Sequence, residues 1–335
     1  MNTVLFWLKN ARYVALPQSV MPAVMAVLLA VGSEDFKIIP ALAAVVGAVV
    51  AHLGMNLADD YFDYRMKSDS VRNRLLHQGF RARIAKCDYL TSQTATPKQL
   101  LIAVFVFLAV AGGLGGIVML YRGVTILYIA FVGLFLGIFY SCPPLKLSYL
   151  GLGDIVIGIM FGPLLMSGVY FAACGELTGF AVFASVPVGI LVMNIIFTHS
   201  IMDRHADRAI GKMTFATLLT GNKALLTAGF MVCFAPFFVV TAGVWLGFMH
   251  WLYLAVFMVI PRAVWLFCSM YRFLQNEKAE VRREIWLGRM ENWQRITASG
   301  LDWFMVRWYA SRNLLTSFCF LMMVIHIILQ ITHFK

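Results

Sequence analysis

The sequence predicts an all-α protein, a polytopic membrane bundle of about nine transmembrane helices that forms a single domain over residues 1–335. Composition is the first indication: 61% of the residues are hydrophobic, 13% are charged and the mean hydropathy is +0.80, which is far more apolar than a typical soluble domain. The second is a series of apolar runs long enough to cross a bilayer core of about 30 Å. The third is the gathering of Lys and Arg in alternate loops.

Nine apolar runs are predicted to be the membrane helices. In chain order they are 14–32, 38–58, 100–121, 124–140, 152–173, 179–199, 224–246, 249–271 and 313–331. The fourth run is short and the eighth carries Pro261 and Arg262, so these two have the least defined boundaries. In the third run, the small residues of Gly112-Gly113-Leu114-Gly115-Gly116 predict a surface for close helix packing.

The distribution of basic residues predicts the orientation. With the N-terminus in the cytoplasm, 23 of the 27 Lys and Arg residues fall on the cytoplasmic side, and only Lys37, Arg122 and Lys335 fall outside. We therefore expect an integral protein of the inner or plasma membrane with its active site at the cytoplasmic mouth of the bundle. Topology and attraction to anionic lipid headgroups account for the net charge of +11, so we expect no nucleic-acid partner.

The six cysteines are scattered and lack a CxxC spacing, which indicates neither a disulfide framework nor a zinc site.

A first cluster of carboxylates ends the second run: Asp59, Asp60 and Asp63, with Asp69 in the following loop. Spacings of three or four place these aspartates on one helix face together with His52 and Asn56. The helix dipole disfavours acids at a C-terminus, and like charges this close repel each other unless a cation lies among them. A polar helix end emerging into water is the alternative interpretation.

A second cluster repeats the pattern on the sixth run, where His199, Asp203 and Asp207 follow one another at intervals of four. Mg²⁺ takes oxygen ligands, commonly one or two carboxylates together with substrate phosphates. The two clusters therefore predict Mg²⁺ ions that hold a diphosphate, with one set of residues as both metal ligands and catalytic groups. That set is Asp59, Asp60, Asp63, Asp203 and Asp207. Two unrelated ion-pair networks are the alternative, and His52 and His199 fit either supporting donors or ordinary interior histidines.

Polar and basic side chains near the clusters are the candidates for binding the substrate. They are Asn56, Lys67, Arg72, Lys146, Tyr149, Arg208 and Lys212. Lys146 lies in a short cytoplasmic loop in which prolines and glycines predict a rigid turn. Asp154, at the start of the fifth helix, fits equally a helix-capping acid and a functional residue.

Residues 272–312 form a long charged cytoplasmic segment. Trp286, Met290, Trp293 and Ile296 recur in it at helical spacing, which predicts an amphipathic helix at the membrane interface. Its role as a surface anchor or as a lid beside the active site stays open.

Several motifs together resemble one known family. They are Ala11-Arg12 with Leu16-Pro17-Gln18-Ser19 and Pro22; Asn56-Leu57-Ala58-Asp59-Asp60-Tyr61-Phe62-Asp63-Tyr64; Tyr149-x-Gly151-Leu152-Gly153-Asp154; Phe161-Gly162-Pro163-Leu164 with Gly168-x-Tyr170; and Asp203-x-x-x-Asp207-Arg208 with Gly211-Lys212-x-Thr214-x-Ala216. On these motifs residues 7–246, and more weakly the last run, resemble the UbiA superfamily of intramembrane prenyltransferases. The nearest branch is the 1,4-dihydroxy-2-naphthoate polyprenyltransferases of menaquinone synthesis. The chain departs from that branch at Asp59, where Asn is usual, and at His199–Met202, which replaces Asn-Asn-x-Arg.

The resemblance implies a Mg²⁺-dependent transfer of a polyprenyl group from an allylic polyprenyl diphosphate to an aromatic acceptor, most simply 1,4-dihydroxy-2-naphthoate, giving demethylmenaquinone. Other acceptors of the superfamily remain open, namely 4-hydroxybenzoate, a tetrapyrrole or a glycerol phosphate. A cation-coupled transporter and a degenerate member serving as a scaffold are further alternatives. The transporter predicts carboxylates near the bilayer midplane rather than at the helix ends.

Overall fold

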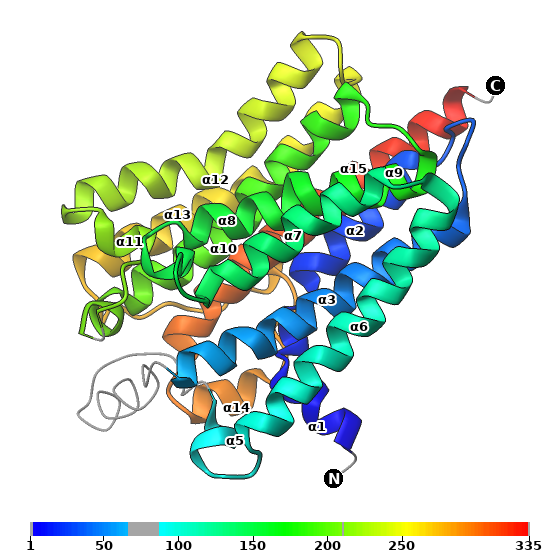
Figure 1. Cartoon of the computed structure of the whole chain (residues 1–335). Coiled ribbons are helices and arrows are strands. Elements are labelled where there is room, and N and C mark those ends of the chain that lie inside the picture. Colours follow the sequence, from blue (N-terminus) through cyan, green and yellow to red (C-terminus); the bar gives the residue numbers. More distant parts are fainter. Residues whose placement is uncertain (1–2, 66–86, 210, 334–335) are drawn as a thin grey trace.

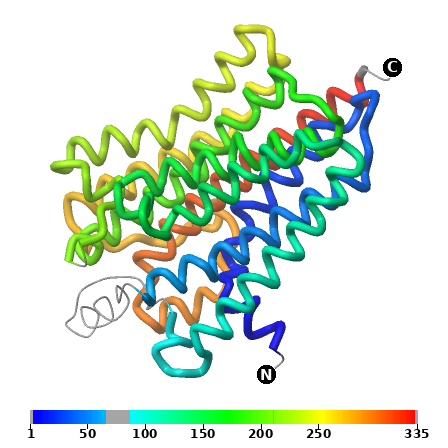
Figure 2. Tube along the Cα trace, viewed as in Figure 1, coloured from blue at the N-terminus to red at the C-terminus, as the bar shows by residue number. Residues whose placement is uncertain are grey.

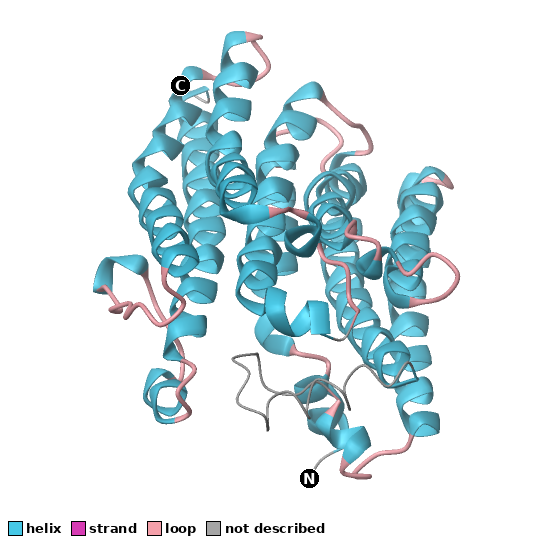
Figure 3. Cartoon of the chain, turned by 90° about the vertical axis from the view of Figure 1, so that its left-hand side faces the viewer, coloured by secondary structure: helices cyan, strands magenta, loops and turns pink. Residues whose placement is uncertain are grey.

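The protein is helical throughout the part that the structure, a computed structural model, describes: residues 3–65, 87–209 and 211–333. Figure 3 shows helices and loops and no strand among these residues. The prediction of an all-α membrane protein is therefore confirmed. Lys67, Asp69 and Arg72 lie outside the described residues.

The long helices share one general direction (Figure 1). Seven segments are long and apolar enough to cross a membrane. They are α3 (Ile38–Arg65), α6 (Pro97–Arg122), α8 to α9 (Gly153–Cys174), α10 (Gly179–Ala209), α12 (Gly221–Trp245), η4 with α13 (Trp251–Gln275) and α15 (Asp302–His333). Two apolar helices are shorter, α2 (Pro17–Ala30) and α7 (Thr125–Ser141). Each of these elements overlaps one predicted run, but because two are short, the number of nine crossings stays a prediction.

Short elements gather at one end of the bundle. They are α1 (Thr3–Asn10), η1 (Tyr13–Ala15), α5 (Asp88–Thr91), η2 (Leu147–Tyr149), α11 (Phe215–Leu218), η5 (Ile285–Leu287) and α14 (Trp293–Ala298). Figure 1 shows α5, α11 and α14 at the end where α3 and α10 finish, whereas the C-terminus lies at the opposite end. Both aspartate clusters therefore face the end that carries most of the short connecting elements.

Prolines explain two irregularities. The fifth predicted run is broken into α8 (Gly153–Ile159), a π-helical turn η3 (Met160–Leu164) and α9 (Leu165–Cys174). Pro163 lies in that turn, where its missing N–H interrupts the regular hydrogen-bond ladder. In the eighth run, the 3-10 helix η4 (Trp251–Val259) gives way to α13 (Ile260–Gln275), and Pro261 occupies the first turn of α13, where a missing N–H costs little.

Close backbone-to-backbone packing occurs between η3 and α10 rather than at the glycines of α6. A Cβ atom built on Gly162 would lie 2.5 Å from the backbone nitrogen of Gly189, so the two backbones touch. On α6, Cβ atoms at Gly112, Gly113, Gly115 and Gly116 would meet nothing within 4 Å. The prediction of a packing surface at these α6 glycines is therefore wrong: the small residues leave space there instead of bringing helices together.

This contrast gives a stability prediction. Gly162→Ala should destabilise the fold by about 1–3 kcal/mol because the added methyl group meets backbone that cannot give way. Gly113→Ala is the matched control and should be neutral or slightly stabilising, since alanine has the better helix propensity by about 1 kcal/mol. Thermal unfolding of the two purified variants in detergent measures the difference. Equal melting temperatures would contradict the packing described for Gly162.

The last helix begins earlier than its apolar run. Helix α15 starts at Asp302 rather than at 313, and it includes the fully buried Arg307. The guanidinium of Arg307 donates to the carbonyl of Trp303 at 2.6 Å and lies 5.0 Å from the ring centre of Phe273. These contacts stabilise the Arg307 guanidinium in a buried position where a hydropathy profile would not predict a charged side chain. Figure 2 shows α15, in red, alongside the blue N-terminal helix α2.

Residues 272–312 do not form one amphipathic helix, which corrects the expectation from helical spacing. The segment contains the end of α13, η5, α14 and the start of α15. Leu287 and Met290 are buried against Val306 and Tyr309 of α15. Asn313 donates to the carbonyls of Leu287 and Arg289 at 3.0 Å, and Arg312 pairs with Glu291 at 3.0 Å. Leu287 and Met290 thus pack on α15 from η5 and the loop after it, and Trp293 and Ile296 pack from the short helix α14, rather than all from one continuous helix.

Candidate functional site

A single large cavity of about 1230 Å³ connects the two aspartate clusters. Among the described residues, its charged lining consists of four aspartates and four bases. They are Asp59, Asp154, Asp203 and Asp207, and Lys9, Arg12, Lys212 and Arg295. Helices α3 and α10, about 140 positions apart in the sequence, therefore contribute carboxylates to one space, as the sequence predicted from their spacing.

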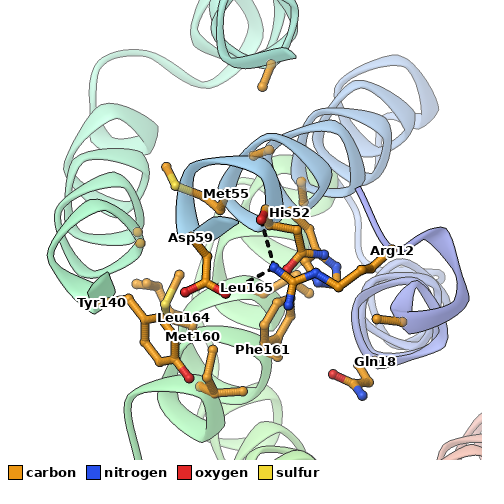
Figure 4. A pocket seen from close by; sticks show the side chains of 18 of the residues that line it. Arg12, Gln18, His52, Met55, Asp59, Tyr140, Met160, Phe161, Leu164 and Leu165 are labelled. Atoms are coloured by element: carbon orange, nitrogen blue, oxygen red, sulfur yellow. Dashed lines mark hydrogen bonds and ion pairs between the residues drawn. The ribbon is translucent and has the colours of Figure 1, made fainter. Parts of the chain in front are cut away.

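The remainder of the cavity is apolar and runs between α3, α6 and α7. Gly112 and Gly115 line it, together with Leu108, Ile129 and Leu134. The space left by the α6 glycines is part of this cavity. Figure 4 shows its middle, where Met55, Met160, Phe161 and Leu164 surround the polar groups. One end of the cavity is thus charged and the rest offers room for an apolar chain.

Asp59 points into the cavity from α3. Its Oδ2 accepts a hydrogen bond from Arg12 at 3.0 Å, and its Oδ1 accepts one from the Ser141 hydroxyl at 2.5 Å. Figure 4 shows Arg12 reaching Asp59 from the N-terminal segment. The carboxylate is therefore fixed from two sides, by residues 47 and 82 positions away in the chain.

Asp60 and Asp63 are buried beside the cavity rather than in its lining. Asp60 accepts hydrogen bonds from Arg12 at 2.9 Å and from the hydroxyl of Tyr89 at 3.1 Å. Asp63 accepts one from the hydroxyl of Tyr149 at 2.9 Å. Asp59 is therefore the member of the first cluster whose carboxylate faces the cavity and could bind a metal ion or substrate there. The contacts of Asp60 and Asp63 turn their carboxylates toward the protein instead.

Arg12 is the main cation of the first cluster. Burial alone would lower the pKa of Arg12, but the neighbouring carboxylates of Asp60 and Asp59 outweigh burial and raise it. Its guanidinium also donates to the backbone carbonyl of Asn56 at 2.7 Å. One planar cation with several donors thus holds two carboxylates of a single helix turn against each other.

Tyr89 is a neutral donor in the same cluster. Burial, and then the negative charge of Asp60, raise the pKa of Tyr89, so its hydroxyl keeps its proton and donates it to the carboxylate.

The second cluster is also buried on α10. Asp203 is 1% exposed and Asp207 is 4% exposed, and both line the cavity. The Nε2 atom of His199 lies 2.9 Å from Oδ2 of Asp203, and its ring packs edge-on against Phe304. His199 therefore orients Asp203, whereas His52 bonds to Ser19 at 2.8 Å and packs against Phe161.

The predicted substrate-binding residues fall into two groups. Asn56 and Lys212 line the cavity, and the side-chain amide of Asn56 donates to the carbonyl of Ala11 at 3.0 Å. Lys146, Tyr149 and Arg208 lie outside the lining as far as the described residues define it. Tyr149 is nevertheless connected to the site, because the Nζ atom of Lys212 lies 5.3 Å from the centre of its ring. Lys67 and Arg72 belong to the part of the chain that is not described.

Sequence reasoning missed Arg12, Ser141 and Tyr89 as parts of the site. Each lies far along the chain from the carboxylate that it contacts. Arg12 carried the one available signal, since it stands just before the first apolar run.

The chain is similar to known membrane prenyltransferases. The model of the UbiA prenyltransferase family matches residues 19–290. The 1,4-dihydroxy-2-naphthoate octaprenyltransferase of Bacillus subtilis is 24% identical over 264 residues, which is 78% of this chain and 80% of that protein. The 2-carboxy-1,4-naphthoquinone phytyltransferase of Synechocystis is 34% identical over 117 residues, which is 34% of this chain and 38% of that protein.

Solved structures share the fold. A structure of digeranylgeranylglyceryl phosphate synthase superimposes with a TM-score of 0.61 at 16% identity and covers 97% of this chain and 100% of its own. A UbiA homolog from Archaeoglobus fulgidus, bound to GPP and Mg²⁺, has a TM-score of 0.58 at 12% identity and covers 92% and 99% of the two chains. At these identities the likeness concerns the fold.

Proposed function

Because the chain belongs to the UbiA prenyltransferase family, we propose that it transfers a polyprenyl group from an allylic polyprenyl diphosphate to 1,4-dihydroxy-2-naphthoate in a Mg²⁺-dependent reaction. The product is demethylmenaquinone, formed in its reduced state. The observation that carries the proposal is the juxtaposition of Asp59 from α3 with Asp203 and Asp207 from α10 around one cavity. Family membership supports the enzyme class over the transporter, and turnover by the purified protein is what tests the alternative of a degenerate member serving as a scaffold.

The carboxylates fit Mg²⁺ that is shared with a phosphate ligand. Among the described residues, no group of three or more His, Cys, Asp or Glu side chains converges into a closed metal site. Mg²⁺ is usually held by one or two carboxylates and completes its octahedron with waters and substrate phosphates, so separated carboxylates on facing walls suit it. Asp59, Asp203 and Asp207 are the residues that would hold it, and bound Mg²⁺ would neutralise the leaving diphosphate.

The other polar residues position the diphosphate and the carboxylates. Lys212 reaches the cavity beside Asp207 and offers its ammonium group to phosphate oxygens. Ser141 and Arg12 fix Asp59, and His199 fixes Asp203. Because these side chains are held before the substrate arrives, little reorganisation is needed during the reaction.

The apolar cavity serves the prenyl tail and protects the reaction. Its walls between α3, α6 and α7 suit a hydrocarbon chain, which gains free energy by leaving water. Phe161 and Met160 line the same space near the charged end and exclude water that would otherwise capture the allylic cation. We place the charged end at the cytoplasmic face, on the basis of the Lys and Arg distribution.

The acceptor assignment is supported by the relatives and by the naphthoate-branch motifs. Several relatives that align over 64% to 78% of the chain are 1,4-dihydroxy-2-naphthoate octaprenyltransferases. Of the departures, Asp59, His199 and Ser200 line the cavity, whereas Ile201 and Met202 are not part of its lining.

A prenyl-transfer assay tests the proposal. It uses the purified protein in detergent, supplied with Mg²⁺ and radiolabelled farnesyl diphosphate. We expect a labelled lipid product with 1,4-dihydroxy-2-naphthoate, release of CO₂ and loss of both on chelation by EDTA. Parallel reactions with 4-hydroxybenzoate, a tetrapyrrole and glycerol phosphate should stay at background. A higher rate with one of these would overturn the acceptor, and an EDTA-resistant rate would overturn the metal dependence.

A further inference from the structure

Asp154 is a buried carboxylate for which the proposed reaction has so far no role. It is 3% exposed, it lines the cavity, and it opens α8. Its Oδ1 atom accepts a hydrogen bond from Ser200 at 3.3 Å, while Oδ2 is buried without a hydrogen-bond partner among the described residues. An unsatisfied carboxylate oxygen is costly to bury, so the site implies a donor that arrives from the cavity.

Helix capping does not explain this residue. A capping acid accepts hydrogen bonds from backbone N–H groups in the first helical turn. The hydrogen bond to Asp154 within the described structure comes from the Ser200 side chain, and α8 has no side-chain cap at its N-terminus. Of the two interpretations of Asp154, a helix-capping acid and a functional residue, the hydrogen-bond geometry therefore favours the second. The side chain faces α10 and the cavity.

The depth of Asp154 separates it from the metal-binding carboxylates. Ser200 precedes Asp203 by three residues, so it lies on the same face of α10 and about 4.5 Å further from the helix end, at 1.5 Å per residue. One turn deeper still, Ile196 and Ile157 line the cavity. Asp154 therefore lies between the carboxylates assigned to the diphosphate and the apolar walls, at the level where the reacting carbon and the acceptor ring must meet.

We propose that Oδ2 of Asp154 accepts a hydrogen bond from a ring hydroxyl of the aromatic acceptor, which makes Asp154 an acceptor-binding residue that also favours attack by the ring. The inference rests on the proposed function, because it assigns a partner for the acceptor in the same cavity. A phenolic hydroxyl is a donor of the required kind, and Ile157 and Ile196 line the cavity one turn deeper, where they offer apolar contact to a ring.

The electron balance shows how this hydrogen bond assists the reaction. The allylic carbon–oxygen bond breaks and its electron pair leaves with the diphosphate. The ring carbon that bears the carboxylate then forms the new carbon–carbon bond with a pair of ring electrons, which makes the ring cationic. Loss of CO₂ returns an electron pair to the ring. The hydroxyl proton stays on its oxygen throughout, and its hydrogen bond to Asp154 strengthens while the ring is cationic.

Asp154→Asn tests the assignment with little change of shape. We expect kcat/KM for 1,4-dihydroxy-2-naphthoate to fall roughly 10- to 100-fold, the size of one hydrogen bond to a charged group. KM for farnesyl diphosphate and the Mg²⁺ concentration for half-maximal rate should stay unchanged. The matched control is Asp88→Asn, since Asp88 is exposed on α5 and lies outside the cavity lining.

Acceptor analogues that lack one hydroxyl make the test independent of how much variant protein folds. In each protein, kcat/KM for the dihydroxy acceptor is divided by kcat/KM for 1-hydroxy-2-naphthoate and for 4-hydroxy-2-naphthoate. One of these two ratios should be roughly 10-fold or more smaller in Asp154→Asn than in the wild type.

Two results would overturn the inference while leaving the proposed function intact. Unchanged ratios would show that Asp154 does not bind a hydroxyl. A shift of the Mg²⁺ dependence in Asp154→Asn would identify the residue as a metal ligand instead. Failure of the proposed function is distinguishable from both, because the wild-type protein would then not prenylate the dihydroxy acceptor at all.

Discussion

Asp203→Asn should lower the rate of prenyl transfer by on the order of 10²–10³-fold, the effect of removing one preorganised charge-stabilising group from an active site. Asparagine keeps the shape of the side chain, but it removes a charge that is 1% exposed, lies on the cavity wall and is oriented by His199. The loss should appear in kcat/KM for farnesyl diphosphate, because the missing charge helps to hold the diphosphate through Mg²⁺ both when it binds and when it departs.

The same assay on two further variants shows whether the effect is specific to the charge of Asp203. His199→Ala removes the group that orients Asp203 and should reduce kcat/KM less than the loss of the charge itself. Asp88→Asn leaves the cavity intact and should retain wild-type rates. Retention of activity within a few-fold in Asp203→Asn would show that α10 does not hold the diphosphate.

Arg12→Ala should destabilise the protein by about 1.5–3 kcal/mol, because it removes charge-assisted hydrogen bonds to the carboxylates of Asp59 and Asp60. Asp60 would lose one of its donors, and Asp59 would lose its anchor to the N-terminal segment. Thermal unfolding of the purified protein in detergent measures this cost.

Arg12→Lys separates the charge of this residue from its geometry. The three acceptors are contacted by Nη2 at the far end of the Arg12 guanidinium, a position that the shorter side chain of lysine does not reach, so an intermediate loss is expected. Lys9→Ala is the control, since Lys9 is an exposed base at the same cavity mouth and should change stability by less than about 0.5 kcal/mol. Equal stability of the Arg12→Ala and Lys9→Ala variants would contradict the role of Arg12.

The pH dependence of this pair follows from the raised pKa of Arg12. A cation whose pKa is higher in the folded state contributes stability that is lost only as the pH rises through that pKa. Because the ordinary pKa of arginine already lies far above pH 10, no alkaline loss of stability from this group is expected up to that pH.

Periodicity and charge were sufficient to predict the helices and the two carboxylate faces, because both are properties of local sequence. The spacing of Asp59, Asp60 and Asp63 predicted one shared helix face. It did not indicate which carboxylate faces the cavity, and the structure places Asp59 in the lining but not Asp60 or Asp63. That choice is made by Arg12, Tyr89 and Tyr149, whose distances along the chain carry no periodic signal.

The remaining errors arose where tertiary contacts override local preference. The α6 glycines were expected to pack closely, yet the backbone contacts are made by Gly162 and Gly189, and nothing in either sequence pattern distinguishes the two cases. The last apolar run was predicted to begin at 313, whereas α15 begins at Asp302 and includes Arg307, whose guanidinium contacts the carbonyl of Trp303 and the ring of Phe273. The helical spacing of Trp293 and Ile296 belongs to the short helix α14, which does not continue back to Trp286.

Binding of radiolabelled farnesyl diphosphate without acceptor tests the central claim most directly, namely that α3 and α10 together hold a prenyl diphosphate through Mg²⁺. The measurement is made on the wild-type protein with Mg²⁺ or EDTA and on Asp59→Asn, Asp203→Asn and Asp88→Asn with Mg²⁺. We predict that the wild type and Asp88→Asn bind only when Mg²⁺ is present and that Asp59→Asn and Asp203→Asn each lose binding. Equal binding in EDTA, or undiminished binding by both site variants, would contradict the claim.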